Sequence, residues 1–560
     1  MTDAARTIDT LSDIYVADYA AIDPQAATYM GVPGYDDQLT DLSPEGFDAR
    51  EELTRRAHDA IGAAAPADER ERVAKEAFLE RTTLSLERYE AHLPHYVVSV
   101  ASGPLHSLRG CFDLMDTSSE EGWTQVLGRL AAVPGTLDGY RRTLDEEATR
   151  GNVAPTAQLT GVAAQLRGWT GHTGPNPSIF NMMVERAPHG PLQQELRKHA
   201  LAATGAFASF ADYLETELAP RGAPKEAVGR ENYALESRYF LGATVDLDET
   251  YTWGWEELKR IEDEMLRVAD KIVPGGSIDD AVAALDADPL RNLPSKEAFR
   301  DWMQQLADET IHDLADVHFE IPQPARRIEC MIAPQTDGGV YYTGPSEDFS
   351  RPGRMWWAVP PENTTFSTWR EVTTVYHEGV PGHHLQIAQT KFRHDLLNRF
   401  LRSMCWVSGS GEGWALYAER LMDELGYLDD PGNRLGMLDM QGFRAGRVIV
   451  DIGMHLELEI PRDNPFGFHP GERWTPELGY EFMRTHSRVS DAELRYELAR
   501  YLGWPGQAPS YKVGERLWMQ AREDAKTRKG ANFDLKEFHT AALNLGSIGL
   551  DPLMRALERV

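Results

Sequence analysis

The residues best suited to chemistry in this 560-residue chain are three histidines and a glutamate within an eight-residue span: His377, Glu378, His383 and His384. Imidazole and carboxylate groups are common zinc ligands, and many zinc hydrolases place two histidines four residues apart on one helix, with a glutamate after the first. Here Pro381 lies four residues after His377, so the simple motif is absent. The cluster therefore predicts a metal site of modified form.

Helix geometry indicates what the modification must be. In a regular helix His377 and His384 would share a face but lie roughly 10 Å apart along the axis, too far for one ion. Pro381 cannot continue a helical ladder, and its flanking glycines tolerate unusual backbone angles, so we expect a bulge at Gly379–Gly382. Looping out two residues favours His377 and His383 as ligands. Looping out three favours His384, which stays the alternative ligand or a hydrogen-bonding neighbour.

Glutamates supply the other expected parts of the site. Glu378 follows the first ligand and is placed to take a proton from a metal-held water and return it to a leaving amine. A catalytic zinc needs a third protein ligand, and Glu412, in a glycine-flanked helix start, is our candidate. Glu419, seven residues later, lies near the same face and is a candidate partner for a ligand histidine. Two imidazoles and a carboxylate suit zinc best.

Three long motifs resemble a bacterial family known as domain of unknown function family 885. The motifs are Tyr376 to His384, Gly411-Glu412-Gly413-Trp414-Ala415-Leu416-Tyr417 and Pro505-Gly506-Gln507-Ala508-Pro509-Ser510-Tyr511-Lys512, and the likeness spans most of the chain. The pattern is also similar to a stretched version of the helical zincin oligopeptidases and carboxypeptidases. That resemblance implies that Gly382-His383 matches their Gly-His pair and that Glu412 is the third ligand. The chain departs from their pattern in the longer gap after Glu378.

Candidate substrate and support residues follow the metal motif. Arg444, Arg447, Asp451 and His455 recur at helical spacing among apolar residues, so this polar stripe is expected to line a cleft. Arg447 is our candidate for binding a substrate carboxylate, which would favour exopeptidase action. Asp451 and His455 are candidates for supporting the metal ligands through hydrogen bonds.

Two further candidates come from the last motif and one from an expected strand. The Tyr511 hydroxyl is a candidate donor to the oxyanion of a tetrahedral intermediate, with a buried structural tyrosine as the competing interpretation. Lys512 is a candidate substrate-binding residue. Tyr342 lies in a strand-like run, 340–342, that would supply an edge to which an extended peptide adds by backbone hydrogen bonds.

These elements are expected to be positioned by a mostly α, elongated, multi-helix zincin-like fold. Amphipathic helices such as 68–92 and 123–150 fill the first part, and Ser43 and Ser295 begin capped helices. Three short β-like runs, 327–332, 339–342 and 355–359, predict a small sheet beside the metal-binding helix. We expect an N-terminal helical lobe over residues 1–320 and a catalytic lobe over 321–560.

The composition limits the classes of partner. The net charge of −31 argues against binding to nucleic acid or an anionic membrane. Met1 to Leu11 lacks the pattern of a signal peptide, and Cys111, Cys330 and Cys405 look like buried thiols, so we expect a cytoplasmic protein. The oligomeric state stays open.

Together these features predict a zinc metallopeptidase that acts on short peptides. Two alternatives share the same residues: a zinc amidohydrolase acting on a small non-peptide amide, and a non-catalytic metal-binding protein. A closed pocket would favour the first alternative, and a fourth protein ligand would favour the second. Glu378 favours hydrolysis, because a structural metal site has no need of a base.

Overall fold

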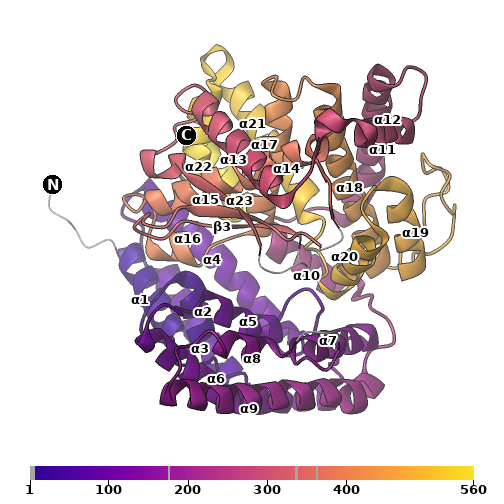
Figure 1. Cartoon of the computed structure of the whole chain (residues 1–560). Coiled ribbons are helices and arrows are strands. Elements are labelled where there is room, and N and C mark those ends of the chain that lie inside the picture. Colours follow the sequence, from indigo (N-terminus) through magenta and orange to yellow (C-terminus); the bar gives the residue numbers. More distant parts are fainter. Residues whose placement is uncertain (1–6, 174–176, 334–338, 361–362, 560) are drawn as a thin grey trace. The chain divides into compact units, whose positions relative to one another are not determined.

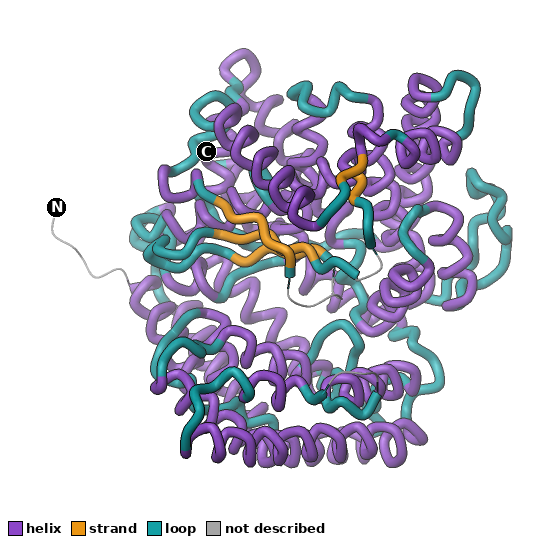
Figure 2. The backbone as a smooth tube through the Cα atoms, viewed as in Figure 1, coloured by secondary structure: helices purple, strands orange, loops and turns teal. Residues whose placement is uncertain are grey.

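The computed structural model describes residues 7–173, 177–333, 339–360 and 363–559, and most of them are helical (Figure 1). The strands are few and short (Figure 2). The mostly α class predicted from the sequence is therefore confirmed. Residues 1–6, which begin the segment inspected for a signal peptide, lie outside the described residues. None of the helices in the described part combines the length and apolar character needed to cross a bilayer.

The chain divides into two compact units. The first contains Met1–Ala67, Thr82–Leu235 and Arg495–Pro505, and the second contains Asp68–Arg81, Glu236–Leu494 and Gly506–Val560. Residues 236–320, which the sequence analysis assigned to an N-terminal lobe, thus cluster with the residues of the metal motif.

The first unit is built from helices around one apolar core. Ser43 accepts a hydrogen bond from the Gly46 N–H and begins the capped helix expected there, and Leu130, Tyr140 and Phe207 are buried in the core. Its helices are α1 Thr7–Ile22, α2 Pro24–Met30, α3 Pro44–Ala63, α5 Pro104–Gly110, α6 Glu120–Arg150, α7 Thr156–Trp169, α8 Ile179–Val184 and α9 Pro191–Tyr213. Helices α4 Glu69–Glu90, α10 Gly229–Leu241 and α20 Asp491–Gly503 have residues in both units.

The second unit holds every candidate site residue. Its central helix is α18, whose residues are buried almost without interruption from Leu435 to His455. Gly254 on α11 lies against Val448 and Ile449, so the two helices approach closely. The helices are α11 Leu247–Ile272, α12 Ile278–Ala287, α13 Lys296–Leu314, α14 Thr368–Glu378, α15 His383–Phe392, α16 Arg399–Ser403, α17 Ser408–Glu424, α18 Pro431–His455, α19 Pro476–His486, α21 Ser510–Lys529, α22 Leu535–Leu543 and α23 Leu550–Glu558.

The predicted sheet is present. Strands β2 Ile328–Ile332, β3 Val340–Thr343 and β4 Gly353–Trp357 form it in the order β2-β4-β3. Strand β4 runs parallel to β2 and antiparallel to β3, with Tyr342 opposite Met355. Strands β1 Asn292–Leu293 and β5 Phe366–Ser367 form a separate two-stranded pair just before α14. In this described sheet β3 is an edge strand, and its Tyr342 reaches toward α15.

Candidate metal centre

The metal motif lies where one helix ends and the next begins. Helix α14 ends at Glu378 and α15 starts at His383, so the expected bulge within a continuous helix is instead a break. The Gly382 N–H donates to the Tyr376 carbonyl at 3.0 Å, and the His384 N–H donates to the Gly379 carbonyl at 3.1 Å. Two separate helices form because Pro381 removes a donor from the ladder. A Cβ on Gly382 would overlap the His377 carbonyl oxygen, so only glycine fits this turn.

The break brings three metal-binding side chains together. The Glu412 Oε2 atom lies 3.4 Å from His377 Nε2 and 3.2 Å from His383 Nε2. One ligand atom from each of the three residues falls within 4.8 Å of the others, the only such cluster among the described residues. Two atoms each about 2.05 Å from a tetrahedral zinc are about 3.3 Å apart, so the two spacings to Glu412 fit one ion.

Close helix packing positions Glu412. A Cβ on Gly413 would meet the backbone of Gly514, so α17 and α21 touch through these two glycines. Helix α17 begins at Ser408 rather than at Glu412, which places the carboxylate in the second turn. The contact with α21 thus fixes the position of α17 while Glu412 faces the histidines, and the Glu412 side chain is 12% exposed.

A hydrogen-bonded pair orients the first histidine. His377 Nδ1 lies 2.8 Å from Glu419 Oε1, and the Thr373 hydroxyl donates to Glu419 Oε2 at 2.7 Å. A carboxylate can only accept, so Nδ1 carries the proton and Nε2 offers its lone pair toward Glu412. The contact that the sequence analysis considered for Glu419 is present.

His384 points away from the cluster. Its Nε2 lies 2.8 Å from the Ala325 carbonyl, and its Nδ1 lies 2.8 Å from the Tyr342 hydroxyl. Nε2 must therefore donate and Nδ1 accept, which fixes a neutral ring whose two nitrogens are both engaged. Burial lowers the pKa of His384 to about 4. This geometry favours His383 over His384 as the second ligand, and it gives Tyr342 a partner inside the protein.

Glu378 is buried beside the cluster, and one of its carboxylate oxygens is available to accept a hydrogen bond. Its Oε2 atom has no hydrogen-bond partner among the described residues. Burial raises the pKa of Glu378, although the neighbouring His383 and His377 oppose this. A buried carboxylate oxygen without a protein donor is costly unless water or a ligand satisfies it. The carboxylate is thus available to accept a proton.

The charges of the cluster are strongly coupled. Burial alone would raise the pKa of Glu412, but the two histidines hold it well below its ordinary value. Burial would lower the pKa of His377, but hydrogen bonds with Glu412 and Glu419 raise it. The carboxylate and the imidazole groups thus stabilise each other's charged forms.

The polar stripe on α18 is buried, so it is not a solvated face. The Arg447 guanidinium carbon lies 4.5 Å from the Phe443 ring centre and 5.0 Å from that of Tyr511. These contacts place Arg447 and Tyr511 together, and their roles toward substrate stay predictions. Asp451 accepts the Gly506 N–H at 2.9 Å, and its other oxygen lies 3.9 Å from His455 Nε2. This pair thus contacts the turn before α21.

Arg444 belongs to the same polar stripe of α18, and its sequence position alone predicted no role for it. Arg444 is 9% exposed. Its charge is a smaller influence on two pKa values: it opposes the rise that burial causes at Glu378, and it adds to the lowering that His377 causes at Glu419. Helical spacing put four polar residues on one stripe, but which arginine faces the cluster depends on how α18 packs against α14 and α17.

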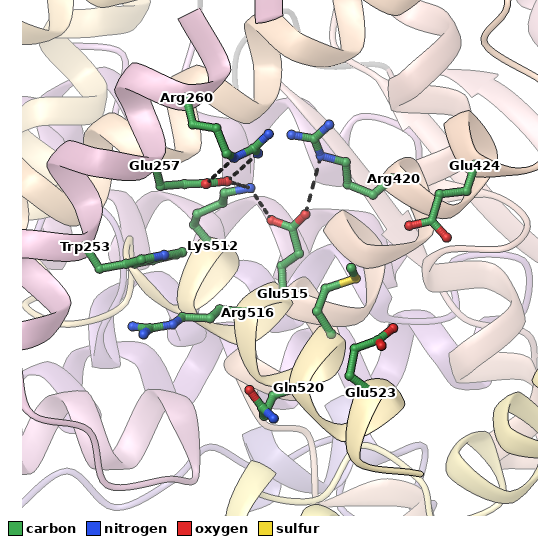
Figure 3. Close-up of a pocket in the computed structure, with 11 residues that line it drawn as sticks. Trp253, Glu257, Arg260, Arg420, Glu424, Lys512, Glu515, Arg516, Gln520 and Glu523 are labelled. Carbon is green, nitrogen blue, oxygen red and sulfur yellow. Dashed lines mark hydrogen bonds and ion pairs between the residues drawn. The ribbon is translucent and has the colours of Figure 1, made fainter. Parts of the chain in front are cut away.

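Lys512 lies in an internal ion-pair network. Its Nζ contacts Glu515, Glu257 Oε1 at 3.0 Å and Gln441 Oε1 at 2.5 Å. Figure 3 shows Lys512 with Glu257 and Glu515 in a pocket of about 470 Å³ between α11, α17 and α21. The ammonium has three protein partners for its three donors, so the contacts favour a structural role for Lys512 over the substrate-binding role predicted from the sequence.

The fold and the cluster define a mostly helical protein with a His-His-Glu centre at a helix break. Residues 24–557 match the family described as "Bacterial protein of unknown function (DUF885)", and the chain belongs to this family. The family resemblance found in the sequence motifs is therefore confirmed. A comparison with curated proteins gave no match.

Two solved structures share the fold. A putative lipoprotein from Colwellia psychrerythraea is 21% identical, with a TM-score of 0.84 and 99% of each chain covered. A putative lipoprotein of unknown function from Shewanella oneidensis is 17% identical, with a TM-score of 0.74, covering 98% of this chain and 99% of that one. At these identities the similarity establishes the fold and not the activity.

These comparisons correct one expectation. The sequence predicted a cytoplasmic protein, whereas both structural neighbours are described as putative lipoproteins. The cytoplasmic prediction is contradicted and is withdrawn. The prediction rested on the residues from Met1 to Leu11 and on three cysteines. These thiols are indeed unpaired and buried, but buried thiols can persist wherever solvent and partner thiols cannot reach them.

Proposed function

We propose that this protein is a zinc-dependent hydrolase that cleaves peptide bonds in short peptides. The observation that carries the proposal is the convergence of His377 Nε2, His383 Nε2 and Glu412 Oε2 at spacings suited to one tetrahedral ion. The described cluster has three members, which leaves a coordination position for water or substrate. The pattern is also similar to that of zincin peptidases, in which a Gly-His pair and a later glutamate complete the site.

Each side chain has a defined task in this proposal. A bound zinc ion would supply Lewis-acid chemistry, lowering the pKa of a coordinated water and polarising the substrate carbonyl. Glu378 accepts the proton of the attacking water at Oε2 and later donates it to the leaving nitrogen. Glu419 holds His377 in the tautomer that presents Nε2 to the metal.

Metal analysis of purified protein tests the proposal. We expect about one zinc per wild-type chain, loss of zinc in His377→Ala, and retention of zinc without activity in Glu378→Gln. His394→Ala is the matched control, because His394 is exposed and follows the same helix, α15. Activity is assayed against a mixed library of dipeptides to hexapeptides by mass spectrometry.

Three results would contradict the proposal. The first is a wild-type protein that contains no divalent metal and cannot be reconstituted after exposure to zinc. The second is peptide cleavage that proceeds undiminished in Glu378→Gln. A protein that binds zinc but cleaves no peptide in the library would also exclude peptidase action.

A further inference from the structure

Arg444 is a buried arginine whose charge is not matched by an adjacent carboxylate. Its sequence neighbours Phe443 and Ala445 are apolar, and its one hydrogen bond runs from Nη1 to the Met440 carbonyl of its own helix, at 3.3 Å. Within the described residues, no carboxylate lies at ion-pairing distance, and the buried Nε has no acceptor. Burial of an unmatched guanidinium is costly, so such a group usually has an anionic partner.

Another arginine on the same helix shows the usual arrangement. Arg434 contacts Glu264 and Asp423, each at 3.1 Å, and it is more exposed than Arg444. The arginine nearer the surface thus has two carboxylate partners, whereas the one in the interior has none. Because burial removes a charge from water, the buried Arg444 needs a carboxylate partner more than Arg434 does. A ligand carboxylate would supply that partner.

Helix packing directs Arg444 toward the metal centre. Gly436 lies against the Trp369 backbone, and Asp439 lies 3.7 Å from Arg370, so α18 and α14 advance in the same direction from these contacts. Continuing along both helices brings Arg444 toward the end of α14, where His377 and Glu378 lie. Its electrostatic effect on Glu378 and Glu419 agrees with this location.

We propose that Arg444 binds the free C-terminal carboxylate of the peptide substrate, which would make the enzyme an exopeptidase acting near that end. This inference rests on the proposed peptidase function for its substrate, but its binding step can be measured without turnover. Nη1 is occupied by Met440, so the edge formed by Nε and Nη2 is the one that makes no hydrogen bond within the described protein. Two parallel donors on one edge match the two oxygens of a carboxylate.

Paired ligands that differ only in the carboxylate test the proposal. N-acetylated amino acids with several side chains and the corresponding amides are titrated calorimetrically into zinc-loaded Glu378→Gln protein, which prevents turnover. We expect the acid of the best pair to bind roughly 10- to 100-fold more tightly than its amide. Adding Arg444→Met should remove this preference, and Arg444→Lys should retain part of it, because lysine keeps the charge but not the fork.

Arg434→Met is the control on the same helix and should preserve the preference. Variants are compared only when their zinc content and melting temperature match those of the parent. Equal binding of acid and amide in every pair would overturn the proposal even if Arg444→Met failed to fold, because that comparison needs no arginine variant. A preference that persists in Arg444→Met would also overturn it.

Kinetics separate this proposal from the function on which it rests. If wild-type protein cleaves peptides but binds acids and amides equally, the hydrolase stands and the carboxylate site fails. If acids bind selectively through Arg444 but no peptide is cleaved, the carboxylate site stands and the peptidase fails. If Arg444→Met lowers kcat/KM equally for free and amidated peptides, Arg444 does not recognise the C-terminus, and the proposal is overturned.

Discussion

Glu419 and His377 are joined by a 2.8 Å hydrogen bond between Oε1 and Nδ1, and Thr373 donates to the second oxygen of the same carboxylate. Both oxygens of the Glu419 carboxylate therefore contact α14, one through Thr373 and the other through His377. The bond fixes which ring nitrogen is protonated, and through it the nitrogen that can meet a metal.

We predict that Glu419→Gln weakens zinc binding about 10- to 100-fold, because an amide is a poorer partner for the Nδ1 proton. Competition with a chromophoric chelator measures the change in dissociation constant. Glu424→Gln, on the same helix but paired with Arg522 away from the cluster, is the control and should bind zinc as wild type does. Unchanged affinity in Glu419→Gln would show that the hydrogen bond does not support the ligand.

Replacement of His384 should leave the metal in place. Both of its nitrogens are engaged by Ala325 and Tyr342, so His384→Gln should retain one zinc while losing about 1–3 kcal/mol of stability. Tyr342→Phe should also retain zinc, at a cost of about 1 kcal/mol. Zinc content and melting temperature are the measurements. Loss of zinc in His384→Gln with a normal melting temperature would assign the second ligand to His384.

Gly382 should tolerate no side chain. In Gly382→Ala the new Cβ would meet the His377 carbonyl oxygen, a backbone atom that cannot turn aside. We expect a loss of roughly 1–3 kcal/mol or more, accompanied by loss of zinc, because the turn sets the distance between the two histidines. Gly205→Ala provides the contrast: it lies in α9 with nothing within 4 Å of the added Cβ, and it should stabilise the helix by about 0.5–1 kcal/mol. Thermal melting and metal content report both effects.

Acid should destabilise the protein through His539. Burial, Arg522 and His318 lower the pKa of His539 to about 3, and Arg522 donates to the Tyr417 hydroxyl, which in turn donates to His539 Nε2. The unfolded state takes up a proton below about pH 6.5 while the folded state does not, so stability is complete above that pH and declines as the pH falls toward 3. The expected loss at pH 5 is about 2 kcal/mol.

Melting temperatures at pH 7.5 and pH 5 test this prediction in wild type and in His539→Gln. The variant should lose less between the two pH values, although it is less stable at both. The exposed His394→Gln control should keep the wild-type dependence. An identical drop in wild type and His539→Gln would assign the acid sensitivity to other groups.

The sequence was sufficient to predict the elements but not all of the contacts between them. Periodicity and caps indicated the helices that became α3, α4, α6 and α13, and three β-like runs became β2, β3 and β4. These features are local. The position of the helix break was also predictable, because Pro381 and its glycines act on their own neighbours, whereas the division into two helices depended on how the turn packs.

Contacts between distant residues explain what could not be predicted. His384 is separated from Ala325 by 59 residues and from Tyr342 by 42, so no local pattern could choose between His383 and His384. The Lys512 partner Glu257 belongs to a helix far earlier in the chain, so no local pattern could indicate this ion pair. Arg444 and Arg447 were equivalent by spacing, and only the orientation of α18 distinguishes them.

The break between α14 and α15 has a mechanical consequence. Because His377 ends one helix, His383 begins the next and Glu412 belongs to α17, a single bound ion would cross-link three segments that a continuous helix would have reduced to two. Metal occupancy and local unfolding are then thermodynamically linked: an ion at about 100 times its dissociation constant would add about 2.7 kcal/mol to the opening free energy of these segments. Amide hydrogen exchange that becomes slower on adding zinc, and only in α14, α15 and α17, would indicate this cross-link.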